Sequence, residues 1–217
     1  PGSRFCLAAD NHNSVNGIRE FAACRGACTR YLALDAELRI ADPEGQLAGA
    51  DPAHPNLFAF PAQSNFSGVQ HPLALVERAR ALGYDVLLDA AAFVPTNRLD
   101  LSRVAPDFVA ISFYKLFGYP TGIGALLARR DALAKLRRPW FGGGTVRFVA
   151  AQNQVHIPYR DAAAFEDGTL NFLDIAAVPR GLDFLDSVGV ERIHDHVTAL
   201  TGELLDGLRA LTYADGR

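Results

Sequence analysis

The stretch "DFVAISFYKLFGYPTGIGALLA", residues 107–128, places a lysine at the end of an apolar run and just before a glycine-rich turn. Lys115 is one of only two lysines among the 21 basic residues of the chain. Its immediate neighbours are aromatic and aliphatic, which is unusual for a lysine on a solvated surface. The apolar runs 107–113 and 124–129 are continuous rather than alternating, so we expect two strands that are covered on both faces.

Similar apolar runs recur along the chain and alternate with helical patterns. This alternation predicts an α/β fold with a mostly parallel sheet and helices on both faces. Pro179 is expected to kink or divide one of the helices. The segment 38–56 is rich in Asp, Pro and Gly and is expected to be a surface loop, and another loop is expected after "GGGT" at 142–145. The remaining expected strands are 4–9, 56–62 and 85–91, and the expected helices are 71–83, 130–138, 171–189 and 190–211.

The composition limits the possible functions. The chain has 217 residues, of which 49% are hydrophobic, so it can form one sizeable domain or two small ones. The net charge is −3 and both signs are interspersed, so we expect no nucleic-acid partner. No apolar run reaches the roughly 20 residues of a membrane span, and no signal peptide is visible. With three cysteines, we expect no disulfide framework and a cytoplasmic location. The lack of Met and the abrupt end at "YADGR" suggest a fragment.

Polar side chains follow four of the expected strands. In α/β sheets, ligands bind beyond the carboxyl ends of the strands. Each of these residues alone has an ordinary explanation as a cap, a turn residue or a loop residue. Together they supply an imidazole, an amide, a carboxylate and an amine: His12 after "RFCLAA", Asn65 after "NLFAFPAQS", Asp89 after "DVLL", and Ser112 with Lys115 at the end of "DFVAISF".

This set matches the needs of pyridoxal 5'-phosphate (PLP). PLP requires a lysine amine for a Schiff base and an acidic partner for its pyridine nitrogen. A lysine among apolar neighbours is partly desolvated, which raises the fraction of free amine. The phosphate requires hydroxyls and backbone N–H donors, which Ser112 and the "FGGGT" segment could supply.

Five blocks of the sequence resemble the PLP-dependent domain of molybdenum cofactor sulfurases, in the class V aminotransferase and cysteine desulfurase superfamily. The resemblance runs in order across essentially the whole chain. It implies the PLP-dependent transferase fold type I, with residues 1–189 as a partial large domain and 190–217 as a helix leading toward a truncated small domain. The blocks are "DNHNSVNGIRE", "FAFPAQSNFSGVQHPL", "LLDAAAFVPTNRLDLS", "DFVAISFYKLFGYPTGIGALLAR" and "FGGGT…FEDGTLNFLDI".

The resemblance also implies a role for each site residue. Lys115 resembles the Schiff-base lysine, and Asp89 resembles the partner of the pyridine nitrogen. Asn65 resembles the amide at the phenolic oxygen of the cofactor, and Ser112 resembles a phosphate ligand. Gly144 and Thr145 would reach the phosphate of the neighbouring subunit in a homodimer. A histidine normally stacks on the ring; we expect His12, although a one-residue shift would place Asn11 there.

The implied activity is transfer of sulfur from L-cysteine to an acceptor, by resemblance the molybdenum cofactor. The sequence departs from the wider desulfurase pattern at Tyr114, where His is usual, and at Ala92, where Gln is usual. None of the three cysteines matches the family's persulfide position, so the nucleophilic thiol is expected outside this chain. Cys24 and Cys28 are expected to be ordinary thiols, and no metal site is expected.

Two other readings remain open from the sequence. The chain could carry another PLP reaction of the same superfamily, such as β-lyase or aminotransferase chemistry. It could also be a non-catalytic fragment or scaffold that holds no cofactor. P-loop, dinucleotide-binding and G-x-S-x-G motifs do not occur.

Overall fold

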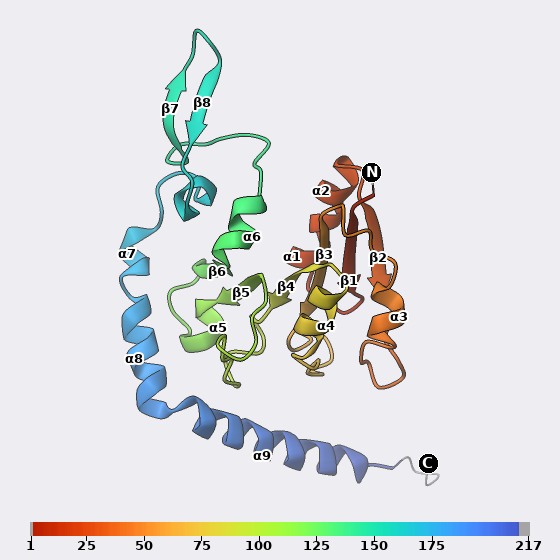
Figure 1. Ribbon diagram of the computed structural model, residues 1–217. Coiled ribbons are helices and arrows are strands. Elements are labelled where there is room, and N and C mark those ends of the chain that lie inside the picture. Colours follow the sequence, from red (N-terminus) through yellow and green to blue (C-terminus); the bar gives the residue numbers. More distant parts are fainter. Residues whose placement is uncertain (1, 213–217) are drawn as a thin grey trace.

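A six-stranded sheet forms the centre of the protein in the computed structural model, which describes residues 2–212 (Figure 1). Its strand order is β2-β1-β3-β4-β5-β6. The first five strands in this order pair in parallel and β6 is antiparallel to β5, which confirms a mostly parallel sheet. The strands are β1 (Arg4–Ala8), β2 (Cys28–Leu32), β3 (Asn56–Pro61), β4 (Asp85–Asp89), β5 (Phe108–Ser112) and β6 (Gly124–Ala128).

All five strands expected from the apolar runs are present, and β2 is an additional one. Its sequence, "CTRYL", exposes three of five residues, because it forms the edge of the sheet. An edge strand needs little apolar sequence, so no continuous apolar run marks it.

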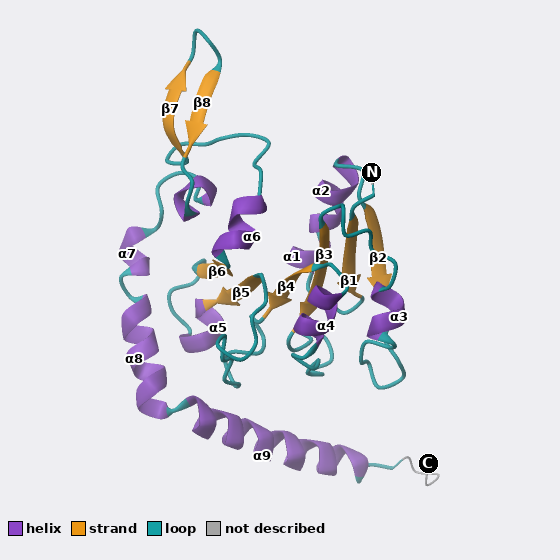
Figure 2. Cartoon of the chain, viewed as in Figure 1, coloured by secondary structure: helices purple, strands orange, loops and turns teal. Residues whose placement is uncertain are grey.

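Helices cover both faces of the sheet, as predicted (Figure 2). On one face, Phe58 and Phe60 pack against α3 (Pro43–Leu47) and α4 (Leu75–Ala81). On the other face, Phe5 and Leu7 pack against α1 (Asn13–Asn16) and α2 (Ile18–Cys24). Because side chains of a strand alternate between faces, β1 contributes to both clusters.

Two segments that were expected to be loops also contain regular structure. Segment 38–56 contains α3, whose Leu47 is only 1% exposed. Asp42 caps this helix by accepting from the Gly45 N–H, and Pro43 fits its first turn. The segment after "GGGT" forms an antiparallel hairpin, β7 (Val146–Ala150) and β8 (Val155–Pro158), which projects from the rest of the chain (Figure 1). Its residues are largely exposed, so burial gives no sequence signal there.

Residues 172–209 form an arm of helices beside and below the sheet (Figure 1). Pro179 lies in the first turn of α8, so the expected 171–189 helix is divided, as predicted. The boundary at 189/190 between the two expected domains coincides with a break between helices, but the domain division itself stays a prediction, and residues 1 and 213–217 lie outside the described part. The remaining helices are α5 (Phe113–Phe117), α6 (Arg130–Lys135), the 3-10 helix η1 (Ala162–Phe165), α7 (Phe172–Ile175), α8 (Val178–Val188) and α9 (Val190–Arg209).

Among residues 2–212, no helix is both long and apolar enough to cross a membrane.

Candidate active site

The carboxyl ends of β1, β3, β4 and β5 meet at one edge of the sheet, because these four strands are parallel neighbours. The register places Pro61 beside Asp89, and Asp89 beside Ala110. Two backbone hydrogen bonds extend the ladder past the strands, from Ala62 N to Asp89 O at 2.8 Å and from Ala90 N to Ala110 O at 3.0 Å. The loops that carry the residues expected from the sequence therefore leave the sheet side by side.

Asp89 and Ser112 lie on the same face of the sheet. Asp89 pairs with Ala110, and Ser112 follows Ala110 by two residues, so strand alternation gives all three the same side. Leu87, two residues before Asp89, packs with the cluster that α1 and α2 cover. The carboxylate thus faces the side on which α1 begins.

Asp89 and Lys115 are both partly buried and both lack a charged partner. One oxygen of Asp89, Oδ1, accepts from the Ala91 N–H at 3.0 Å. Across the part of the chain that the structure describes, neither residue forms an ion pair. A partly buried amine and carboxylate without mutual pairing are both available to a ligand that lies between them.

Lys115 lies on the short helix α5, directly after β5, rather than on the strand itself. Ser112 is the N-cap residue of this helix, but among residues 2–212 its side chain makes no capping hydrogen bond, so its hydroxyl is available to a ligand. The ring of Phe117 stacks on Phe113 with centroids 5.9 Å apart. Phe117 also lies against Gly181 of α8, where an added Cβ would be 2.4 Å from the ring. The contact with Gly181 therefore holds the helix that carries Lys115 against α8.

Asn11 and His12, the two candidates for stacking on the cofactor ring, have different surroundings after β1. The Asn11 side chain is buried and donates at 2.9 Å to both Ala8 O and Ala59 O, so it ties β1 to β3. The His12 side chain is exposed and caps α1 by accepting from the Ser14 N–H at 3.2 Å through Nδ1. Only the imidazole is accessible to a ligand at this edge.

Asn65 lies in the exposed part of the loop that follows β3. The Ser64 hydroxyl accepts from the N–H groups of Phe66 and Ser67, both at 3.3 Å, and so holds a turn around Asn65. The "SNFSG" segment is thus a turn held by hydrogen bonds to the Ser64 hydroxyl, and it places an amide beyond the carboxyl end of β3.

Gly144 and Thr145 do not join the other residues within one chain. Their segment follows α6, on the side of the sheet away from α5 (Figure 1). The Thr145 side chain is buried, donates to Gly142 O at 2.8 Å and accepts from Gly142 N at 3.0 Å. The hydroxyl of Thr145 is thus engaged in its own loop.

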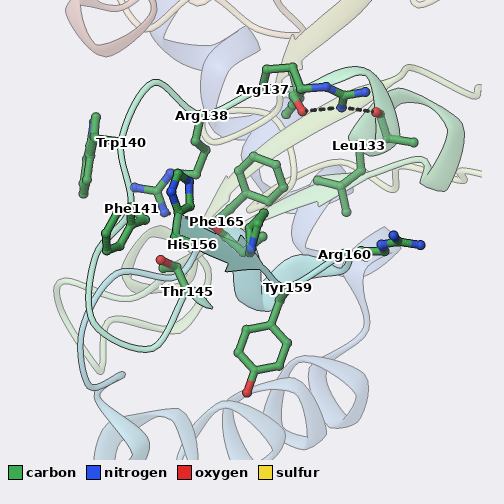
Figure 3. Close-up of a pocket in the computed structure, with 14 residues that line it drawn as sticks. Leu133, Arg137, Arg138, Trp140, Phe141, Thr145, His156, Tyr159, Arg160 and Phe165 are labelled. Atoms are coloured by element: carbon green, nitrogen blue, oxygen red, sulfur yellow. Dashed lines mark hydrogen bonds between the residues drawn. The ribbon is translucent and has the colours of Figure 1, made fainter. Parts of the chain in front are cut away.

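A cavity of about 490 Å³ lies beside this glycine-rich segment, between α6 and the hairpin. Figure 3 shows Arg138, Trp140 and Phe141 gathered at one side of it. Arg138 lies over the Trp140 ring at 4.2 Å and bonds both carboxylate oxygens of Asp167 at 2.8 Å. Phe141 stacks on His156 with centroids 4.4 Å apart.

One polar pair near the edge was not predicted from the sequence. His71 Nε2 lies 2.9 Å from Asp10 Oδ2, and the two side chains are 0% and 3% exposed. His71 directly follows the "SNFSGVQ" block, which is a visible signal, but its partner is 61 residues away. Only the tertiary structure brings the two together.

The mostly parallel sheet with helices on both faces, together with the polar residues at the carboxyl ends of its strands, defines an α/β protein of the PLP-transferase type. The family match agrees. The Aminotransferase class-V profile matches residues 1–214, and the chain belongs to this family.

Curated relatives are molybdenum cofactor sulfurases. The chain is 41% identical to that of Bos taurus, over 99% of this chain and 26% of the relative, and 42% identical to that of Anopheles gambiae, over 100% and 30%. The chain therefore spans less than a third of these relatives.

Solved structures confirm the expected fold type I. The cysteine desulfurase CsdA of Escherichia coli matches with a TM-score of 0.84 at 24% identity, over 97% of this chain and 52% of that one. The cysteine desulfurase of Thermococcus onnurineus matches with a TM-score of 0.79 at 25% identity, over 95% and 52%. A C-DES variant with glycine covalently linked to its PLP cofactor matches with a TM-score of 0.78 at 23% identity, over 97% and 56%.

Proposed function

We propose that this chain is the cofactor-binding part of a PLP-dependent enzyme that mobilises sulfur from L-cysteine, with the molybdenum cofactor as the sulfur acceptor. The names of the curated relatives and of the solved neighbours support this activity. The observation that carries the proposal is that Asp89 ends β4 and Lys115 follows the neighbouring strand β5, and that neither forms an ion pair within residues 2–212.

The residues at this edge fit PLP chemically. Bound PLP supplies an electron sink for the substrate's α-carbon. Asp89, whose second oxygen has no hydrogen-bond partner in the described part of the chain, would hold the proton on the pyridine nitrogen. Lys115 would attach the cofactor through Nζ and, once released by the substrate amine, would carry the α-proton on the same atom.

The other edge residues would orient the ring. His12 is the exposed ring beside the β1 exit and would stack on the cofactor, whereas Asn11 is buried and its side-chain Nδ2 already donates to Ala8 O and Ala59 O. Asn65 would donate to the phenolic oxygen. Ser112 has an uncommitted hydroxyl and would bind the phosphate.

The three cysteines of this chain do not suit the sulfur-accepting step. Burial raises the pKa of the Cys6 thiol, which keeps it protonated and unreactive. Cys24 and Cys28 are exposed, but Cys28 begins β2 and so lies at the amino-end edge of the sheet, opposite the candidate site. The persulfide would form on a thiol elsewhere in the whole protein.

We further propose that the protein acts as a cytoplasmic homodimer. The glycine-rich segment lies away from the candidate site at the carboxyl ends of the strands of its own subunit. A segment that contacts the site of the partner subunit requires this arrangement. The N–H groups of Gly143 and Gly144 have no acceptor within the described residues. These N–H groups would bind the cofactor phosphate in the partner subunit more readily than the Thr145 hydroxyl, which is already hydrogen-bonded to Gly142.

Product analysis of the full-length protein tests the function. The purified protein should be yellow, and with L-cysteine it should release alanine while sulfur appears as a persulfide or sulfide. Pyruvate instead of alanine would indicate β-lyase chemistry, and transfer of the amino group to a keto acid would indicate an aminotransferase. A colourless protein that takes up no added PLP would overturn the proposal.

A further inference from the structure

The loop that carries Asn65 is closed at its base and is expected to move as one unit. His71 N donates to Ala62 O at 3.0 Å, and Ser64 N donates to Val69 O at 2.8 Å. Gln63 and Gln70 form an isolated antiparallel bridge between these bonds. The position of the Asn65 amide therefore depends on how this base is held against the sheet.

A buried side-chain contact joins the base of this loop to the segment that follows the neighbouring strand β1. The His71 imidazole reaches Asp10, two residues before His12, and the carboxylate can only accept, so Nε2 donates. Both side chains are almost fully buried. The second atoms of the pair, Asp10 Oδ1 and His71 Nδ1, have no hydrogen-bond partner among the described residues. Within the described residues, the 2.9 Å contact is thus the one hydrogen bond that offsets the burial of these two side chains.

We propose that Asp10 and His71 are a positioning pair that sets the distance between His12 and Asn65 across the cofactor ring. The inference rests on the proposed function, because it assigns these two residues to the cofactor. Neither Asp10 nor His71 would touch PLP. They would act by joining the loop after β1 to the loop after β3, so that the stacking imidazole and the donating amide approach the same ring from fixed positions.

Substitution of His71 separates positioning from general packing. His71→Leu removes the donor, whereas His71→Gln keeps an N–H donor for Asp10. In the full-length protein, we expect His71→Leu to weaken PLP binding by roughly tenfold, because a hydrogen bond to a charged group is lost. We expect His71→Gln to remain within about threefold of the wild type. The readouts are PLP titration of the apoprotein and the induced circular dichroism of the bound cofactor, which reports how the ring is held.

Asp107 provides a matched control for loss of a buried carboxylate. Its side chain is 4% exposed, and it accepts from Val86 N at 2.8 Å at the opposite, amino-end edge of the same sheet. Asp10→Asn and Asp107→Asn should both lower the melting temperature. Only Asp10→Asn should weaken PLP binding and reduce the circular dichroism band.

Equal PLP affinity and equal circular dichroism in wild type, His71→Leu and His71→Gln would overturn the positioning role. The same conclusion follows if Asp107→Asn changes the cofactor signals as much as Asp10→Asn. If Asp10→Asn does not fold, the two His71 variants decide, measured below the lower of their melting temperatures. If the wild type itself binds no PLP, the proposed function fails, and that outcome is distinct from wild-type binding with unaffected variants.

Discussion

Gly181 of α8 lies directly against the ring of Phe117, two residues beyond Lys115 on α5, with room for no side chain between them. This contact links the C-terminal arm to the helix that carries the proposed catalytic amine. An alanine Cβ at position 181 would be 2.4 Å from Phe117 Cδ2, a distance that the ring can relieve only by moving. Because the Phe117 ring is also packed on Phe113 of the same helix, we expect it to relieve the contact by a shift of α5 rather than by rotation of the ring alone.

We therefore expect Gly181→Ala to destabilise the protein by about 1–3 kcal/mol, the usual cost of overpacking, despite the better helix propensity of alanine. It should also lower the yield of borohydride-trapped cofactor on Lys115. Gly202→Ala in α9 is the control, since nothing lies within 4 Å of its added Cβ. Wild-type stability and trapping in Gly181→Ala would show that the contact does not position α5.

Substitution of Asp89 should separate cofactor binding from turnover. Asp89→Asn keeps the side-chain volume and the acceptor for the Ala91 N–H, but it removes the charge that would hold the pyridine proton. We expect PLP to remain bound and alanine formation to fall by roughly a hundredfold or more, as for other preorganised electrostatic groups. Measurement of kcat alongside cofactor content checks this. Near-normal turnover would contradict the electron-sink role of the cofactor.

The adjacent residues Asn11 and His12 should have opposite mutational effects. Asn11→Ala loses two buried hydrogen bonds, at about 1 kcal/mol each, and should lower the unfolding free energy. His12→Gln removes an exposed ring but keeps a side-chain acceptor for the Ser14 N–H, so it should change stability little, while it weakens PLP binding and alters the cofactor absorption. Chemical denaturation and PLP titration of both variants measure the two effects. If Asn11→Ala loses cofactor without losing stability, the stacking residue has been assigned wrongly.

The core tyrosine Tyr84 should make stability fall at alkaline pH. Burial, together with the hydrogen bond to Cys6, raises the pKa of Tyr84 from 10.0 to about 12. Between these values the unfolded chain releases the phenolic proton and the folded chain keeps it, so stability decreases as pH rises from about 10 to about 12. Tyr84→Phe should flatten this decrease, although at pH 7 it loses the bond to Leu47 O, worth about 1 kcal/mol. An unchanged slope in urea denaturation across that range would argue against the raised pKa.

The sequence predicted the sheet well because its central strands are buried on both faces. The runs that form β1, β3, β4 and β5 are apolar throughout, and parallel pairing then brings the ends of these strands to one edge. The edge strand β2 and the exposed hairpin β7–β8 have no such run and were not predicted.

The details of the edge depend on tertiary contacts that no local pattern encodes. The sequence left Asn11 and His12 as alternatives, and the bond from Asn11 Nδ2 to Ala59 O, 48 residues away, shows that this side chain is held inside the sheet. The pairing of Asp10 with His71 and the approach of Gly181 to Phe117 are likewise long-range. Local sequence identifies the kinds of groups at the edge, and the fold determines which of them are free.

Mapping of the borohydride-reduced full-length protein by mass spectrometry tests the central claim most directly. We predict a phosphopyridoxyl label on the peptide that contains Lys115, at Nζ of that residue, and no label in the Lys115→Ala variant. A label on Lys135 or on another residue of the whole protein, or an unchanged label in Lys115→Ala, would contradict it.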